Sequence, residues 1–444
     1  MREWERHLLA NQERHLAELL DFLRIPSVSG EGVHRADVDR AGRWVARRLS
    51  QAGLEHVRYD YPVVYGDWLH APGKPTVLIY GHFDVEPAGE LRRWSGQPFE
   101  PRVEGGRIFA RGASDDKGNM LIPILAVEAL LRTDGALPVN VRFVLEGQEE
   151  IGSPDLPRWI AANRQQLACD LVVSADGGQW GEDQPALTLG CRGLSSFNLS
   201  VRGPAKDLHS GVYGGTIQNP IHALVRILDS LRNADGTVAV NGFYDGVQAE
   251  HQKAPTDFCE HAYAAELGVD ELFGEAGYTT LERSWLRPTL EVHGIWGGSP
   301  AAIVPAEARA AVTCRLVPGQ EPARILDLIE QHVTKQAPQG VRTHVERLPG
   351  TARPYRIPGA HPANRAAADV LTEVYGKAPI TVMMGATIPV CALFRDLLGA
   401  DTLLFGFGLD DENIHGPDEF FRLVSWERGK RAYCRLLERL VTPW

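Results

Sequence analysis

Short apolar runs separated by helical segments constrain the fold of this chain more than any other feature of its sequence. Residues 76–80 form a continuous apolar run with β-branched side chains, and 139–145 and 171–174 follow the same pattern. Such runs are typical of strands buried on both faces of a parallel sheet. Apolar residues recur with helical spacing before and between them, at 3–23, 37–52 and 118–131. The sequence therefore predicts an α/β fold, with a mostly parallel sheet covered by helices on both faces.

The pattern changes in the middle of the chain, where strands of alternating polar and apolar residues replace the buried runs. We expect such strands at 194–202, 289–293 and 309–316, and helices at 220–232 and 321–334. Residues 236–290 are acidic and rich in loops. After about residue 352 the α/β pattern returns, with helices predicted at 360–375 and 423–440 and a strand at 402–405. We therefore predict one domain formed by 1–190 and 353–444, with a smaller α+β domain inserted at 191–352.

The composition excludes several classes of protein. The 57 acidic residues outnumber the 46 basic ones, and the formal net charge is -11 at pH 7. A nucleic-acid-binding protein needs a basic face to neutralise phosphates, so we expect no nucleic-acid partner. No apolar run reaches the roughly 18 residues that span a bilayer, and the N-terminal segment lacks the apolar stretch of a signal peptide. The six cysteines are far apart and typical of reduced core residues. We therefore expect a cytoplasmic protein without a membrane partner.

Acidic and histidine residues gather at the ends of the predicted strands. Four such clusters directly follow a strand, and a fifth opens the helix predicted at 118–131. Their histidines and acids include His82, Asp84, Asp115, Asp116, Glu149, Glu150, Asp176 and His415. Each cluster alone has an ordinary explanation, such as a helix cap or a solvated turn. Because parallel strands end at one edge of a sheet, the five clusters together predict one site.

Histidine and carboxylate ligands without cysteine suit Zn²⁺, Co²⁺ or Mn²⁺. The clusters hold more acids than one ion needs. Two ions roughly 3.5–4 Å apart, bridged by a carboxylate, are the simplest interpretation, and such pairs hydrolyse amides and phosphate esters. The clusters alone leave both reactions open, although a phosphoesterase should also carry basic phosphate clamps near its metals. A binding module without catalytic activity is a further alternative.

The same residues resemble the metal-binding pattern of a known family. Its parts are His-Phe-Asp at 82–84, Gly-Ala-Ser-Asp-Asp-Lys-Gly at 112–118, Glu149-Glu150, Asp176 and His415. This pattern is similar to that of the co-catalytic zinc metallopeptidases, which include carnosinases, bacterial dipeptidases, aminoacylases, glutamate-releasing carboxypeptidases and desuccinylases. In the inserted domain, 207–211 and 315–318 also resemble this family, and 285–290 resembles its longer carnosinase-like branch.

The resemblance implies a role for each member of the metal cluster. His82 and Asp176 would bind one ion, Glu150 and His415 the other, and Asp115 would bridge the two. Asp84 would orient His82, and the peptide bond between Asp115 and Asp116 would be cis. Glu149 would be the general base that takes a proton from a metal-bridging water. The expected cofactors are two divalent ions per chain, zinc first, with manganese or cobalt as alternatives.

The resemblance also assigns the domains and the substrate contacts. The domain formed by 1–190 and 353–444 would be catalytic, and 191–352 would be a lid through which the chain forms a homodimer. His209 would stabilise the oxyanion in the partner subunit's site, and Arg315 would hold the substrate's C-terminal carboxylate. Asn219, Gly385 and Thr387 are further candidate substrate-binding residues, although Asn219 could equally mark the start of a helix.

Two segments depart from the family pattern. The carnosinase-like branch usually has Lys-Thr-Val-Ile-Pro where residues 301–305 read Ala-Ala-Ile-Val-Pro. It has Arg-Glu-Gly-Gly-Ser-Ile-Pro where 383–389 read Met-Met-Gly-Ala-Thr-Ile-Pro. Met383 and Met384 replace a base and an acid, and methionines form an apolar, adaptable wall. We therefore predict hydrolysis of dipeptides or similar small peptides, with an N-acyl-amino-acid amidohydrolase as the alternative. The general base Glu149 argues against a binding module.

Overall fold

The chain divides into two compact units in this computed structural model, which describes residues 1–252, 255 and 258–442. The first unit comprises Met1–Leu189, Ile357–Val382 and Leu393–Trp444, and the second comprises Gly190–Arg356 and Met383–Ala392. Met383–Ala392 thus belongs with the second unit, although the sequence prediction placed this segment in the catalytic domain. Residues 253–254 and 256–257 of the predicted acidic stretch, and 443–444 at the C-terminus, lie outside the described residues.

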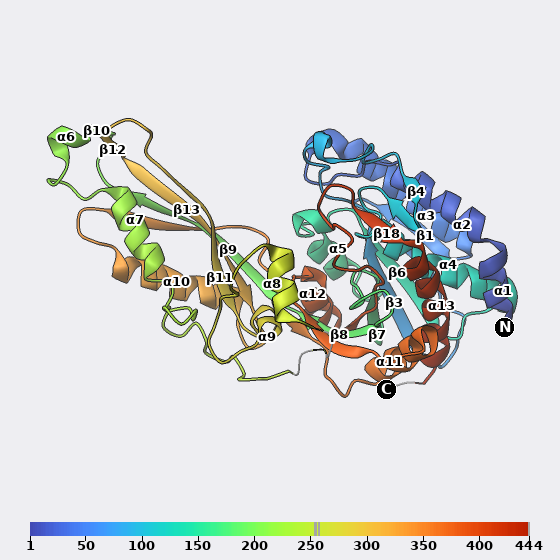
Figure 1. Cartoon of the computed structure of the whole chain (residues 1–444). Coiled ribbons are helices and arrows are strands. Elements are labelled where there is room, and N and C mark those ends of the chain that lie inside the picture. The colour runs from blue at the N-terminus through green and yellow to red at the C-terminus, as the bar shows by residue number, and fades with distance from the viewer. Residues whose placement is uncertain (253–254, 256–257, 443–444) are drawn as a thin grey trace. The chain divides into compact units, whose positions relative to one another are not determined.

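The first unit is built on a six-stranded sheet (Figure 1). Its strand order is β1 (Glu55–Asp60), β2 (Val63–Trp68), β6 (Asn140–Glu146), β3 (Thr76–His82), β7 (Leu171–Ser174) and β17 (Asp401–Leu404). The four strands from β6 to β17 are parallel, whereas β1 and β2 form an antiparallel edge. The predicted α/β fold with a mostly parallel sheet is therefore confirmed, and β1 and β2 are strands that the periodicity did not reveal.

Both faces of this sheet are buried. Successive side chains of a strand point to opposite faces, and in β3 Val77 and Ile79 join the main apolar core, to which α4 (Lys117–Asp134) also contributes. Tyr80 points to the other face, where its ring lies 5.5 Å from that of Phe394 in α12 (Pro389–Leu398). Burial on both sides explains why the strands read as continuous apolar runs.

The remaining helices of the first unit match the predicted ones, apart from one correction and from α5 (Leu156–Ala162), which was not predicted. They are α1 (Glu3–Ala10), α2 (Gln12–Leu23), α3 (Arg35–Ala52), α5, α11 (Pro362–Tyr375) and α13 (Leu423–Arg439). The single helix predicted at 3–23 is wrong, because the helix is interrupted at Asn11. The side-chain amide of Asn11 donates to the His7 carbonyl at 2.8 Å. A small sheet of β18 (Phe420–Arg422), β5 (Arg107–Phe109) and β4 (Arg102–Glu104) completes this unit.

The second unit has a four-stranded antiparallel sheet. Its order is β11 (Thr289–Gly297), β13 (Glu307–Leu316), β9 (Gly193–Arg202) and β14 (Arg342–Arg347). Helices α7 (Pro220–Asp229) and α10 (Pro322–Gln336) pack on one face and enclose a separate apolar core. The opposite face is polar, which accounts for the alternating pattern of these strands.

Short elements complete the described chain. A two-stranded pairing joins β10 (Leu208–His209) to β12 (Ile303–Val304), and α6 (Ser210–Tyr213) follows β10. Within the predicted loop-rich stretch lie α8 (Glu260–Leu267) and α9 (Thr280–Trp285). A three-stranded sheet contains β15 (Tyr355–Arg356), β8 (Ala186–Cys191) and β16 (Ile380–Met384).

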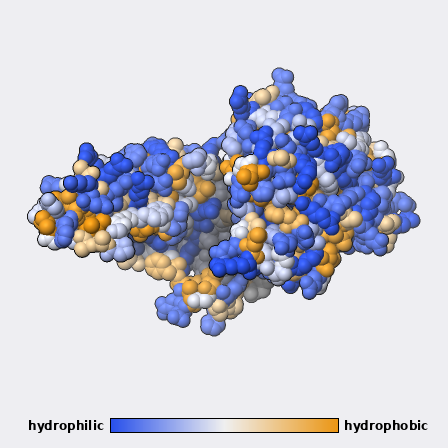
Figure 2. Space-filling model, turned by 90° about the horizontal axis from the view of Figure 1, so that it is seen from above, coloured by the Kyte–Doolittle hydropathy of each residue, from blue (hydrophilic) through white to orange (hydrophobic). Residues whose placement is uncertain are grey.

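The surface of each unit is mixed. In the view of Figure 2, hydrophilic residues cover most of the surface, with hydrophobic residues interspersed in small groups. Four of the cysteines are buried as expected of core residues, whereas Cys259 is exposed, so that expectation is wrong at this position. Among the described helices, none is both long enough and apolar enough to cross a membrane.

Candidate metal centre

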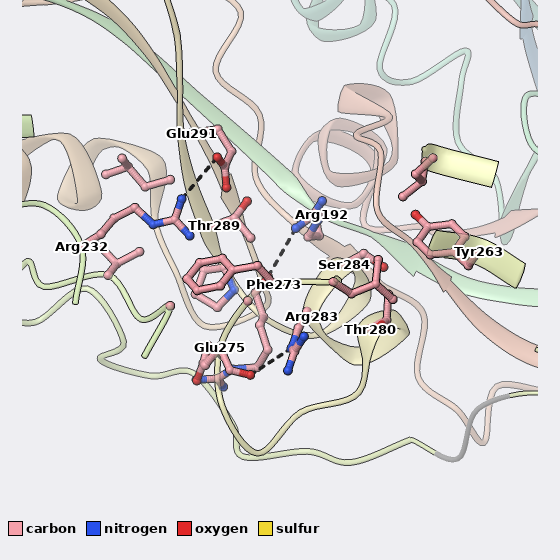
Figure 3. A pocket seen from close by; sticks show the side chains of 18 residues that line it. Arg192, Arg232, Tyr263, Phe273, Glu275, Thr280, Arg283, Ser284, Thr289 and Glu291 are labelled. Carbon is pink, nitrogen blue, oxygen red and sulfur yellow. Dashed lines mark hydrogen bonds and ion pairs between the residues drawn. The ribbon is translucent and has the colours of Figure 1, made fainter. Parts of the chain in front are cut away.

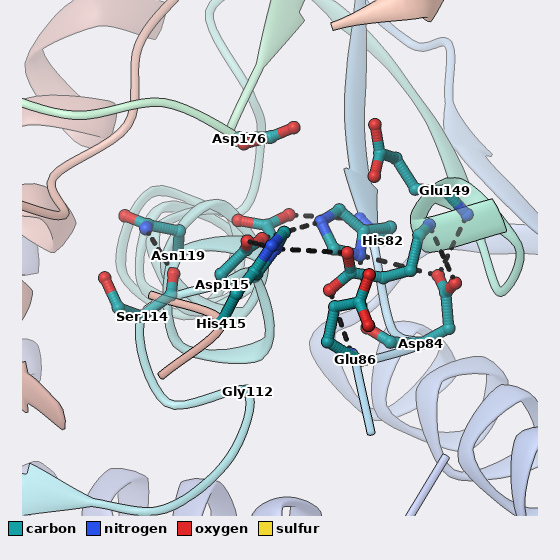
Figure 4. A network of polar contacts seen from close by, with 12 residues as sticks. His82, Asp84, Glu86, Gly112, Ser114, Asp115, Asn119, Glu149, Asp176 and His415 are labelled. Atoms are coloured by element: carbon teal, nitrogen blue, oxygen red, sulfur yellow. Dashed lines mark hydrogen bonds and ion pairs between the residues drawn. The ribbon is translucent and has the colours of Figure 1, made fainter. Parts of the chain in front are cut away.

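The carboxyl ends of the parallel strands bring the predicted ligands together. In the sheet register, His82 at the end of β3 pairs with Glu146 at the end of β6, and Ser174 at the end of β7 pairs with Leu404 at the end of β17. The segments that follow these strands therefore leave the sheet at one edge. Asp115 reaches the same place from the turn before α4, as Figure 4 shows.

Six side chains at this edge form two groups that could each hold a metal ion. The first group is His82, Asp115 and Asp176, and the second is Glu86, Glu150 and His415. Within each group, one ligand atom from every residue lies within 4.8 Å of the others. All five residues that the resemblance implied as ligands belong to these two groups, and they divide between the groups as the resemblance implied for the two ions. Their role as ligands remains a prediction.

Asp115 contacts a histidine of each group. Its Oδ1 lies 3.0 Å from His82 Nε2, and its Oδ2 lies 3.0 Å from His415 Nε2. His415 Nε2 also lies 3.2 Å from Glu150 Oε2. One carboxylate therefore joins the two groups through its two oxygens, which is the arrangement expected of a bridging ligand. The peptide bond after Asp115 is cis, as the resemblance implied.

Asp84 supports both His82 and the turn that carries the paired glutamates. Its Oδ1 lies 3.4 Å from His82 Nδ1, and its carboxylate accepts hydrogen bonds of 3.1 Å from the backbone N–H groups of Glu149 and Glu150. A carboxylate behind a ligand imidazole fixes which ring nitrogen faces the metal. Asp84 can therefore orient the histidine and hold the glutamates at a constant distance from it.

The carboxylates of Glu149 and Glu150 differ in their contacts. The carboxylate of Glu150 contacts His415 and accepts a 3.1 Å hydrogen bond from the backbone of Glu86. Among the residues that the structure describes, no hydrogen-bond donor reaches the carboxylate of Glu149. Burial raises the pKa of Glu149 well above its ordinary value, and the nearby acids Asp176 and Glu150 raise it further. This carboxylate is therefore placed to take up a proton, as a general base requires.

Electrostatics at this edge favour a bound cation. Burial and the neighbouring Asp115 raise the pKa of Glu150 to about 7 and that of Asp176 to about 6. Hydrogen bonds to Asp115 and Glu150 raise the pKa of His415 to about 11. So many acids in a buried place repel one another unless cations neutralise them. Oxygen and imidazole donors without cysteine fit Zn²⁺, Mn²⁺ or Co²⁺, so these residues suit the metal that the resemblance implies.

Sequence reasoning missed Glu86, which completes the second group. Its signal was present, because His82, Asp84 and Glu86 alternate along an extended segment and so share one side of it. Nothing in the sequence pattern pointed to Glu419. This buried carboxylate accepts from the backbone N–H groups of Gly112, Ser114 and Asp115, at 2.9, 3.0 and 3.1 Å.

Arg111 completes the support of that turn. Its guanidinium donates to Glu419 at 2.7 Å and to the backbone carbonyl of His415 at 3.0 Å. Gly112 has a φ of +81°, a left-handed conformation that favours glycine, and a Cβ there would lie 2.5 Å from Val85. The loop of His415 and the turn of Asp115 are thus tied to the same buried pair of charges.

The second unit holds the predicted substrate contacts. The Arg315 guanidinium donates to the Thr387 hydroxyl at 2.6 Å, and the backbone carbonyl of Gly385 accepts from Arg192 at 2.8 Å. Asn219 caps α7 through a 2.9 Å bond from the backbone of Ile221. The helix boundary that was the alternative interpretation of Asn219 is therefore present.

His209 is exposed at the end of β10. Its Nδ1 accepts a 3.0 Å hydrogen bond from the backbone N–H of Gly211. In the described part of the second unit, no hydrogen bond links this imidazole to Arg315 or Thr387. Met383 is buried, with 3% of its surface exposed, and Met384 is partly buried.

The model of peptidase family M20/M25/M40 matches residues 78–439, which include every residue of the two metal-binding groups. The chain belongs to this family. The Cys-Gly metallodipeptidase dug1 of Schizosaccharomyces pombe is 31% identical, over 97% of this chain and 96% of that protein. The fold is also that of M20 peptidases of known structure.

Two solved structures illustrate the likeness. Human carnosine dipeptidase 1 has a TM-score of 0.83 and 25% identity, over 98% of each chain. The M20 family metallo-carboxypeptidase Sso-CP2 of Sulfolobus solfataricus has a TM-score of 0.82 and 29% identity, over 96% of this chain and 99% of its own. The predicted metallopeptidase is thus confirmed, and the dipeptidase prediction is better supported than the N-acyl-amino-acid alternative.

Proposed function

We propose that this metal-dependent dipeptidase hydrolyses the peptide bond of small peptides at a centre of two divalent ions. The observation that carries the proposal is the position of Asp115, whose two carboxylate oxygens each lie 3.0 Å from a different histidine. His82 and Asp176 would hold one ion, and Glu150 and His415 the other. Glu86 is a further donor on the second side. Zinc is the proposed metal, with manganese or cobalt as alternatives.

Such ions, when bound, polarise the scissile carbonyl and make a water molecule more acidic. Glu149 would take the proton of the attacking water and then deliver it to the nitrogen of the departing amine. Its carboxylate is suited to both steps, because no described hydrogen-bond donor occupies it and its raised pKa lets it hold a proton. Asp84 keeps Glu149 in place through the 3.1 Å bond to its backbone N–H.

Residues of the second unit would bind the substrate. The planar guanidinium of Arg315 suits a C-terminal carboxylate, and the Thr387 hydroxyl lies 2.6 Å from it. We propose that His209 stabilises the oxyanion of the reaction in the site of a partner subunit, and that the protein is therefore a homodimer. The exposure of His209 is compatible with this role.

A substrate series tests the proposed activity. The protein is freed of metal with a chelator and then assayed with Zn²⁺, Mn²⁺ or Co²⁺ on Cys-Gly, β-Ala-His and their N-acetylated forms. A phosphate monoester serves as the control for the phosphoesterase alternative. We expect metal-dependent hydrolysis of the free dipeptides. Faster hydrolysis of the N-acetylated forms, or of the phosphate ester, would overturn the proposal.

A further inference from the structure

Glu412 is a buried carboxylate of the first unit that the proposed reaction does not use. It lies three residues before His415 in the sequence. Its Oε2 accepts hydrogen bonds from the Ser114 hydroxyl at 2.6 Å and from the Leu409 backbone N–H at 3.0 Å. Its Oε1 accepts two bonds of 3.1 Å from Arg422, one from the backbone N–H and one from the guanidinium. All of these partners are donors, so both oxygens must be free of a proton to accept them.

These bonds close the loop of residues 409–422, which carries His415. The first and last residues of the loop both donate to the Glu412 carboxylate, and the Glu412 carbonyl accepts from the Phe420 backbone N–H at 3.1 Å. His415 has a φ of +62°, a left-handed conformation that residues other than glycine rarely adopt. Such a conformation persists where surrounding contacts enforce it. Glu412 therefore helps to keep the loop in the form that presents His415.

Ser114 joins this loop to the turn of Asp115. It is buried and directly precedes Asp115 in the chain (Figure 4). Its backbone N–H donates to Glu419 at 3.0 Å, and its hydroxyl donates to Glu412. His415 lies between these two glutamates in the sequence. One serine is thus bound to a buried carboxylate on each side of the histidine.

The chain before the loop is also packed against this turn. A Cβ on Gly408 would lie 2.7 Å from the Ser114 hydroxyl oxygen. The side-chain amide of Asn119 donates to the Ser114 carbonyl at 2.8 Å, and its oxygen accepts from the Phe407 backbone N–H at 2.8 Å. These contacts keep the Ser114 hydroxyl within reach of Glu412.

We propose that Glu412 and Ser114 are positioning residues, which hold His415 where its imidazole can bind a metal ion together with Glu150. This inference rests on the proposed metal centre, and neither positioning residue belongs to a metal-binding group itself. Because 52% of the His415 side chain is exposed, packing alone does not fix it, and its position depends on the loop.

Loss of the bond between Ser114 and Glu412 should affect the two proposed ions unequally. The loop would keep its other links to the turn but would lose the link that precedes His415. The ion proposed for His415 should therefore bind more weakly. The other ion should be less affected, because His82 and Asp176 follow strands of the sheet that this bond does not touch.

Ser114→Ala removes one hydroxyl and leaves the remaining donors of Glu412 in place. The matched control is Ser284→Ala in α9. Ser284 lines a cavity of the second unit (Figure 3), and its hydroxyl donates to the Leu281 carbonyl at 3.0 Å. Both substitutions thus remove a single hydrogen bond, but only Ser114 contacts the loop of His415.

Glu412→Gln places an amide NH₂ group against donors on one side of the side chain. The matched control is Glu128→Gln, because Glu128 is a buried carboxylate of α4 that accepts from Arg14 and Arg48 and belongs to neither metal-binding group. Both variants should unfold at lower urea concentrations than the unaltered protein. Only Glu412→Gln should also bind metal more weakly, which separates positioning from a general loss of stability.

Zn²⁺ affinity is measured by competition with a chelator, and the order of the loop by hydrogen exchange of the metal-free protein. The pH is about 8, because burial raises the pKa of Glu412 to about 7 and the bonds require its ionised form. In Ser114→Ala and Glu412→Gln we expect one of two dissociation constants to rise by about tenfold or more, as for loss of a charge-assisted hydrogen bond. Amides of residues 409–422 should exchange faster in both variants. The controls should show neither change.

Should Glu412→Gln fail to fold, Ser114→Ala alone decides. If the unaltered protein binds Zn²⁺ and Ser114→Ala binds it equally well, the positioning role is wrong and the proposed metal centre stands. Weaker binding without faster exchange of residues 409–422 would also contradict the role. If the unaltered protein binds no Zn²⁺, both the proposed centre and this inference are overturned.

Discussion

Asp115 and His415 are 300 residues apart in the sequence, yet Asp115 Oδ2 lies 3.0 Å from His415 Nε2. The other oxygen of the same carboxylate faces His82 at the same distance. The fold therefore uses one side chain to join two groups of potential ligands, the second of which is completed by His415 from the C-terminal part of the chain. The predicted consequences of removing individual members differ accordingly.

Replacing Asp115 should affect both proposed ions, whereas replacing Asp176 should affect one. We expect about two ions per chain in the unaltered protein, about one in Asp176→Asn and close to none in Asp115→Asn, because a two-metal site depends most on its bridge. Elemental analysis after dialysis measures this. Asp21→Asn is the control, since Asp21 is an exposed residue of α2. An Asp115→Asn protein that retains two ions would contradict the shared-ligand model.

Glu149 and Glu150 are adjacent, but their substitutions should have different effects. Glu149→Gln keeps the size of the side chain and removes only its ability to accept a proton, so we expect kcat to fall by about 10²–10⁴-fold with normal metal content. Glu150→Gln removes an anionic contact of His415, so metal affinity should fall and added metal should restore part of the activity. Measuring kcat and bound metal for both variants checks the roles. Metal loss in the Glu149 variant alone would reverse them.

Metal affinity should weaken as the pH falls. With the pKa of Glu150 raised to about 7 and that of Asp176 to about 6, both carboxyls bind protons in the metal-free protein below those values. A divalent ion must displace these protons, so the apparent Kd should rise by up to about tenfold per pH unit for each proton displaced. Competition with a chelator between about pH 8 and about pH 5.5 measures the trend. A Kd independent of pH over this range would contradict it.

The sequence was informative where a residue's role follows from strand order. His82, Glu150 and Asp176 each come shortly after a run that only a buried strand explains, and parallel strands end at one edge. The sequence alone could therefore predict that these residues lie together. The family resemblance supplied their division between two ions. The strands β1 and β2 were not predicted, because an antiparallel edge does not need the continuous apolar pattern of the central strands.

The features that the sequence did not predict depend on contacts between residues far apart in the chain. Glu419 supports the turn of Asp115 from a loop more than 300 residues away in the chain, and its surroundings in the sequence resemble an ordinary acidic turn. In the second unit, α8 and α9 form within a stretch whose weak periodicity predicted only loops. Long-range packing decides both cases.

Glu419 should be needed for stability as well as for metal binding. Glu419→Ala leaves Arg111 as a buried charge without its partner and frees three backbone N–H groups, so we expect a loss of about 3–5 kcal/mol in the free energy of unfolding. Metal affinity should fall in the same variant, because the turn of Asp115 loses its support. Urea unfolding and metal titration measure the two effects. Glu90→Ala is the control, since Glu90 pairs with Arg92 at the exposed surface and such pairs contribute about 0–1 kcal/mol.

A homodimer with shared sites should allow complementation between two inactive chains. His209→Ala should lack the proposed oxyanion donor, and Glu149→Gln should lack the base, so each homodimer should be nearly inactive. In a mixed dimer, one site would combine an intact Glu149 with an intact His209 of the partner subunit. After subunit exchange, verified with differently tagged chains, about half of the dimers should be mixed and activity should return to about a quarter of the unaltered level, one good site in four. If verified exchange restores no activity, His209 does not act across subunits.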